Sequence, residues 1–159
     1  PFSFTTEETG GIIGNGDITM DWIVHVLKRT VDTQYRTKAD RRHTFLAGSS
    51  MGGLMTLYGL LAYPEVFSRG AALSPSLWIQ REANPPRGRA RVKRNTVLYM
   101  DYGALEFADH PHSRSLFAEV SALLIEKRVL LNSRIVPRGT HCEASWEKQI
   151  PFFMKTLFE

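Results

Sequence analysis

This sequence of 159 residues has only one cysteine, no long apolar run and no bias toward glycine. Cys142 is the only cysteine, which excludes an internal disulfide and a cysteine-based zinc site, and favours a reducing compartment such as the cytoplasm. Twelve glycines and a hydrophobic content of 43% exclude the collagen-like and disordered classes. The longest apolar stretch, residues 54–63, is far short of the roughly 20 residues that a membrane helix needs. We therefore expect a folded protein without a membrane span.

The net charge of +4 comes from one short segment. Residues 81–94 hold six basic side chains and one acid, whereas the rest of the chain carries a net charge of −1. This pattern does not favour a general nucleic-acid binder, and no aromatic residues alternate with the arginines to stack on bases. Two interpretations stay open for this cationic segment: a solvated loop beside Pro85 and Pro86, or a surface that attracts an anionic ligand.

The chain alternates between short apolar runs and helical patterns. A helix is predicted from an N-cap at Asp17 towards Tyr35, where apolar residues recur at helical spacing. The later predicted strands are residues 43–48, 70–73, 96–102 and 133–136, and the later predicted helices are residues 51–63, 113–127 and 144–157. Such alternation predicts an α/β fold with a mainly parallel sheet that helices cover on both faces. Reactive groups are then expected at the carboxyl ends of the strands.

At the end of the first predicted strand, residues 48–52 read Gly-Ser-Ser-Met-Gly and fit the pattern G-x-S-x-G with Ser50 at its centre. A serine on a tight strand-to-helix turn has an exposed oxygen, and the backbone N–H of Met51 is placed to bind an oxyanion. The pattern also occurs by chance as a glycine-rich turn. Because a strand precedes it and an apolar helix follows, we predict that Ser50 is a nucleophile.

A serine nucleophile needs a histidine base, and in this fold the base follows the nucleophile and the acid in chain order. His25 and His43 precede Ser50, and we expect His110 and His112 to cap a helix. His141 follows the last predicted strand, on a loop at the carboxyl end of the sheet. We therefore predict that His141 is the base.

Three carboxylates near the end of the strand at residues 96–102 are candidates for the acid. Asp101 falls within the predicted strand, while Glu106 and Asp109 come after Gly103. We favour Glu106, with Asp109 second and Asp101 third, because a side chain in the loop is free to reach His141. Spacing alone does not decide between them.

These motifs resemble the esterase branch of the α/β-hydrolases, which includes ferric enterobactin-type esterases, feruloyl esterases, S-formylglutathione hydrolases and mycolyl transferases. The resemblance runs from about Gly14 to Leu157, and its strongest blocks are residues 47–54, 63–67, 73–78, 99–106 and 139–146. It implies the α/β-hydrolase fold and a triad of Ser50, His141 and Glu106. It also implies that Trp78 lies near the substrate pocket, against the equal alternative of a core or rim aromatic. Trp146 is expected to pack.

The expected function is a serine carboxylic-ester hydrolase that works through an acyl-enzyme on a small-molecule ester, without a metal or organic cofactor. Siderophore or aromatic esters are candidate substrates, and the cationic segment suits an anionic one. The alternatives are an acyltransferase of the same fold and a non-catalytic binding module.

One element of the family pattern has no counterpart in the sequence. A second oxyanion donor normally comes from a loop upstream of the nucleophile, but only 49 residues precede Ser50. Gly10 and Gly11 are a poor substitute because they stand before a helix. We therefore expect residues 1–159 to be the C-terminal part of a larger hydrolase domain, whose N-terminal half lies elsewhere on the polypeptide.

Overall fold

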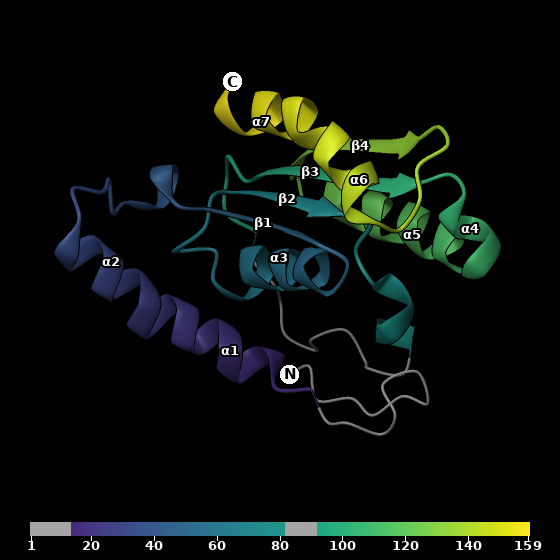
Figure 1. The fold of residues 1–159 in the computed structure, drawn as a ribbon. Coiled ribbons are helices and arrows are strands. Elements are labelled where there is room, and N and C mark those ends of the chain that lie inside the picture. The colour runs from purple at the N-terminus through teal and green to yellow at the C-terminus, as the bar shows by residue number, and fades with distance from the viewer. Residues whose placement is uncertain (1–13, 82–91) are drawn as a thin grey trace.

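The short apolar runs form a parallel sheet of four strands in the described part of the chain. The computed structural model describes residues 14–81 and 92–159. The strands are β1 (Phe45–Ser49), β2 (Arg69–Leu73), β3 (Val97–Gly103) and β4 (Leu130–Val136), and they lie side by side in that order (Figure 1). Every neighbouring pair is parallel, with Phe45 opposite Arg69 and Val97 opposite Leu130. This confirms the predicted α/β class.

Helices connect the strands and cover both faces of the sheet. They are α1 (Gly16–Trp22), the π-helix η2 (Ile23–Leu27), α2 (Lys28–Gln34), η3 (Arg41–His43), α3 (Met51–Ala62), η4 (Leu77–Arg81), α4 (Glu106–Asp109), α5 (Ser113–Glu126), α6 (Glu143–Trp146), η5 (Glu147–Gln149) and α7 (Ile150–Phe158). In Figure 1, α7 lies on one face of the sheet and α3 on the other. No helix in residues 14–81 and 92–159 is long and apolar enough to cross a bilayer.

The side chains of β3 point alternately to the two faces of the sheet, and each face carries one apolar cluster. Leu98, Met100 and Tyr102 pack with residues of α3 and α5 in the larger cluster. Tyr99 points to the other face, where it joins Leu157 of α7 in the smaller cluster. Burial of both faces explains why this strand reads as a nearly continuous apolar run. The same alternation places Asp101 on the face of Tyr99, and its carboxylate accepts a hydrogen bond from the hydroxyl of that tyrosine.

Several predicted boundaries differ from the structure. Helix α1 begins at Gly16, so Asp17 is not the N-cap but a first-turn acid, and its carboxylate accepts the N–H of Ile18. His43 belongs to η3 rather than to the strand, because the Asp40 side chain begins that short helix by accepting the N–H of Arg42. Strand β4 starts at Leu130, three residues before the prediction. The Gly10–Gly11 pair and residues 82–91 of the cationic segment fall outside the described residues.

Candidate active site

Ser50 stands on a strained turn between β1 and α3. Its backbone has φ 55° and ψ −119°, a conformation that a residue with a side chain rarely adopts. The turn is tight because a Cβ atom on Gly48 would come within 2.5 Å of the carbonyl carbon of Gly52. The N–H of Ser50 also donates to the carbonyl oxygen of Leu73, at the end of β2, over 2.9 Å. These contacts hold the serine at the carboxyl edge of the sheet, where the sequence placed it.

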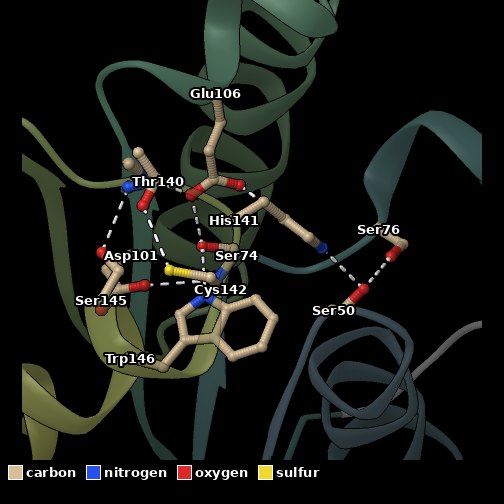
Figure 2. A network of polar contacts seen from close by, with 11 residues as sticks. Ser50, Ser74, Ser76, Asp101, Glu106, Thr140, His141, Cys142, Ser145 and Trp146 are labelled. Atoms are coloured by element: carbon tan, nitrogen blue, oxygen red, sulfur yellow. Dashed lines mark hydrogen bonds and ion pairs between the residues drawn. The ribbon is translucent and has the colours of Figure 1, made fainter.

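The structure joins the three predicted site residues in one chain of hydrogen bonds (Figure 2). Ser50 Oγ lies 2.9 Å from Nε2 of His141, and Nδ1 of His141 lies 2.6 Å from Oε2 of Glu106. The histidine side chain is 33% exposed, while that of Glu106 is 2% exposed. The hydroxyl, the imidazole and the buried carboxylate are thus hydrogen-bonded in series. In this order the imidazole can take the proton of the hydroxyl, and the carboxylate can stabilise the charged ring.

The buried Glu106 carboxylate keeps its position through several donors. Its Oε1 atom accepts the N–H of Gly103 over 2.8 Å and the hydroxyl of Ser74 over 2.7 Å. Ser74 Oγ in turn accepts the indole N–H of Trp146 over 3.0 Å. Glu106 opens the short helix α4 rather than lying in an irregular loop, which fixes its backbone as well. The carboxylate is therefore oriented before any substrate binds.

Asp101 is buried beside this network and has a different set of partners. One carboxylate oxygen accepts the hydroxyl of Tyr99 over 2.8 Å, and the other accepts the N–H of Ser74 over 3.2 Å. Burial raises the pKa of Asp101 from 3.8 to about 6, although the hydrogen bonds from Tyr99 and Ser74 oppose the rise. Among the carboxylates whose side chains the structure describes, Glu106 is the one that contacts His141. Asp109, the second candidate, ends helix α4.

Trp78, in η4, lies beside the histidine. Its ring makes an edge contact with the His141 ring, with centroids 5.7 Å apart, and it stacks on His110 at 4.2 Å with an angle of 7° between the planes. Both histidines that were expected to cap a helix stand at cap positions, His110 as the C-cap of α4 and His112 as the N-cap of α5, although His112 makes no side-chain capping hydrogen bond. The His110 ring is stacked on Trp78 instead. Trp78 is only partly buried, so a ligand near His141 can reach the aromatic pair.

Two features of the site were not identified from the sequence. The hydroxyl of Ser76 lies 3.1 Å from Ser50 Oγ, and Trp146, expected only to pack, donates a hydrogen bond to Ser74. The available signal was the Ser74-Pro75-Ser76 segment at the carboxyl end of β2, where reactive groups gather. Met51 opens α3 next to Ser50, so its backbone N–H belongs to a helix N-terminus, as predicted.

In the described part of the chain, no group of three or more histidine, cysteine, aspartate or glutamate side chains could hold a metal ion.

Comparison with known proteins places the chain in one family. Residues 17–152 match the family model described as "Putative esterase", and no curated protein matches the sequence. Similar solved structures include enterochelin esterase from Shigella flexneri, with a TM-score of 0.66, 21% identity, and coverage of 86% of this chain and 36% of that one. An IroE-like serine hydrolase from Shewanella oneidensis has a TM-score of 0.66 and 19% identity, and the match covers 92% of this chain and 50% of that one.

A third similar structure is the siderophore hydrolase EstA from Aspergillus nidulans, with a TM-score of 0.63, 20% identity, and coverage of 92% of this chain and 58% of that one. The chain thus spans between 36% and 58% of the length of these three structures. At identities this low, the structural similarity shows a shared fold alone, whereas the family model covers most of the sequence. This chain belongs to the family described as "Putative esterase".

Proposed function

We propose that this chain carries the catalytic residues of a serine carboxylic-ester hydrolase that works through an acyl-enzyme. The observation that supports the proposal is the hydrogen-bonded chain from Ser50 through His141 to Glu106. Membership of an esterase family and the strained backbone of Ser50 add to it. Each residue then has a defined role in moving one proton.

In the first half of the reaction, Ser50 Oγ attacks the ester carbonyl carbon while its proton passes to Nε2 of His141. Glu106 accepts the Nδ1–H of the histidine, which keeps the ring in the required tautomer and stabilises the imidazolium. The backbone N–H of Met51 donates to the oxyanion. The imidazolium next gives its proton to the departing alkoxide, which leaves as an alcohol, and the acyl group stays on Ser50.

The second half of the reaction uses water in place of serine. His141 removes a proton from the water as its oxygen attacks the acyl carbon, then returns that proton to Ser50 Oγ when the acid product leaves. No atom from a cofactor takes part in this proposed cycle.

We propose an ester with an aromatic or siderophore-type acyl group as the substrate. The stacked pair of Trp78 and His110 offers a flat aromatic surface within reach of His141. Two of the similar structures described above are named as an enterochelin esterase and a siderophore hydrolase. The role of the cationic segment is tested by comparing the turnover of an anionic ester and a neutral analogue at increasing salt concentration. If the segment attracts the substrate, salt should slow the turnover of the anionic ester only.

We also propose that a further segment of polypeptide completes the sheet beside β1. In the described residues β1 pairs with β2 alone, so its other edge offers unpaired backbone groups. A strand on that edge would bring a second oxyanion donor close to Ser50. Mass spectrometry of the intact natural protein tests this, and a mass of 18.0 kDa would contradict it.

A fluorophosphonate probe tests the nucleophile directly. Such a probe phosphonylates an activated serine, so we expect one adduct on the peptide that contains Ser50, and none in Ser50→Ala. His141→Ala should retain Ser50 but react far more slowly, because the base is gone. If the full-length wild-type protein takes up no label at Ser50, the proposed function is wrong.

A further inference from the structure

The segment Ser74-Pro75-Ser76 touches both ends of the candidate triad. It follows directly after β2, which ends at Leu73, and both serines are 1% exposed. The two hydroxyl groups point to different partners, Ser74 to Glu106 and Ser76 to Ser50 (Figure 2). We refer to residues 74–76 as the Ser-Pro-Ser turn. A single short segment thus contacts the acid and the nucleophile at once.

At the nucleophile end of the triad, the directions of the hydrogen bonds identify Ser76 as a donor to Ser50 Oγ. The single proton of Ser50 Oγ must point to Nε2 of His141 for the histidine to act as its base. The contact of 3.1 Å between the hydroxyls of Ser50 and Ser76 then has Ser76 as the donor. The N–H of Ser76 also donates to the carbonyl oxygen of Ser50 over 3.1 Å, which sets the distance between the two residues. Ser76 therefore solvates the oxygen that attacks the substrate.

At the acid end, the same reasoning fixes the proton of Ser74. Trp146 can only donate, so Ser74 Oγ accepts from its indole N–H and directs its own proton to Glu106. The Ser74 backbone has φ 41°, a left-handed conformation that is costly for a serine. That cost is consistent with a hydroxyl group that is required at this point.

We propose that the Ser-Pro-Ser turn is part of the catalytic machinery: Ser76 is a further catalytic residue that donates to Ser50 Oγ as it loses its proton, and Ser74 is a positioning residue that orients Glu106. The proposal rests on the proposed function, since it assigns roles within the same proton transfer. A donor to a developing charge contributes more than a neutral hydrogen bond, because the bond strengthens as the charge grows. Loss of the Ser76 hydroxyl should therefore slow acylation while the substrate binds as before.

The rate of fluorophosphonate labelling tests Ser76 in the full-length protein. We expect Ser76→Ala to label Ser50 about 10- to 100-fold more slowly than the wild type and to show a similar fall in kcat with little change in KM. Ser68→Ala is the matched control: Ser68 is equally buried at the other end of β2, and its hydroxyl has no partner among the residues that the structure describes. Labelling of Ser76→Ala at the wild-type rate would overturn the role of Ser76.

Two substitutions at Ser74 separate positioning from backbone geometry. Glycine accepts a φ of 41° without strain, whereas alanine does not, and both remove the hydroxyl. We expect Ser74→Gly to be more stable than Ser74→Ala, yet both variants to lose about tenfold or more in kcat with little change in KM. A Ser74→Gly variant with full kcat would overturn the positioning role. If the fluorophosphonate probe does not label Ser50 in the wild type, the proposed function itself is wrong. That result is distinct from one in which the wild type is labelled and the variants at Ser74 and Ser76 behave like it.

Discussion

Gly103 and Gly139 touch through their backbones: a Cβ atom on Gly103 would lie 2.4 Å from the carbonyl oxygen of Gly139. The contact joins the last residue of β3, which leads into the loop before Glu106, to the loop before His141. The N–H of Leu105 donates to the same carbonyl oxygen over 3.0 Å, which fastens the two loops together. The distance between the acid and the base thus depends on a pair of residues without side chains.

Replacing Gly103 with alanine should separate acid from base. The added Cβ would also come within 2.5 Å of Oε1 of Glu106, so the carboxylate must move. We expect Gly103→Ala to lower kcat by about 100-fold, since a displacement of about 1 Å in an active site can have an effect of that size. Steady-state kinetics measures the loss. Thermal unfolding checks that the variant still folds, and Gly52→Ala is the control for that measurement because a Cβ there meets nothing within 4 Å. Equal kcat in Gly103→Ala and the wild type would contradict the prediction.

Local patterns account for the parts of the fold that the sequence predicted correctly. The sequence around Ser50 combines an apolar strand, small residues and an apolar helix, and each of these leaves a signal within about ten residues. The order of strands and helices followed from the same kind of signal. Boundaries were less accurate, because the Asp40 side chain and the packing of β4 on β3 decide where His43 and Leu130 belong.

The supporting contacts of the site could not be predicted in the same way. Ser74, Ser76 and Trp146 meet the triad because the Ser-Pro-Ser turn and helix α6, which are far apart in the sequence, converge at the carboxyl edge of the sheet, and no local pattern records which side chains then touch. The three carboxylates near β3 show the same difficulty. Spacing left Asp101, Glu106 and Asp109 as alternatives, and the three-dimensional contact of Glu106 with His141 distinguishes it from Asp101.

Amide substitutions should separate the roles of the two buried carboxylates. Glu106→Gln removes the charge next to His141 and can place an amide N–H against the ring, which favours the wrong tautomer. We expect kcat at pH 7 to fall by about 10³-fold or more. Asp101→Asn, which has no contact with His141, should stay within about tenfold of the wild type. A larger loss from Asp101→Asn than from Glu106→Gln would reverse the assignment of the acid.

Burial of Asp101 should make the free energy of unfolding depend on pH. Its pKa is about 6 in the folded protein, compared with 3.8 ordinarily, so between these values the folded state binds more protons than the unfolded state. Stability should therefore fall as the pH rises from about 4 to 6, by up to about 3 kcal/mol from this group. Urea unfolding at a series of pH values measures the slope. Asp101→Asn should remove this contribution, and an unchanged slope in the variant would contradict the assignment to Asp101.

Trp78 should contribute to the binding of esters with aromatic acyl groups. Trp78→Ala removes the ring that stacks on His110 and contacts His141, so KM for an aromatic ester should rise by about tenfold. KM for an acetyl ester, which lacks a ring, should change much less. Trp78→Phe keeps an aromatic face and should give an intermediate KM for the aromatic ester.

The matched control for Trp78 is Trp22→Ala on helix α1, because that tryptophan is 50% exposed and belongs to neither the triad nor the aromatic pair. It should leave KM for both esters unchanged. Because the Trp78 ring also contacts His141, a general disturbance of the histidine would lower kcat for both esters alike. Equal effects of Trp78→Ala on the aromatic and acetyl esters would therefore mean that Trp78 supports the histidine and does not select the acyl group.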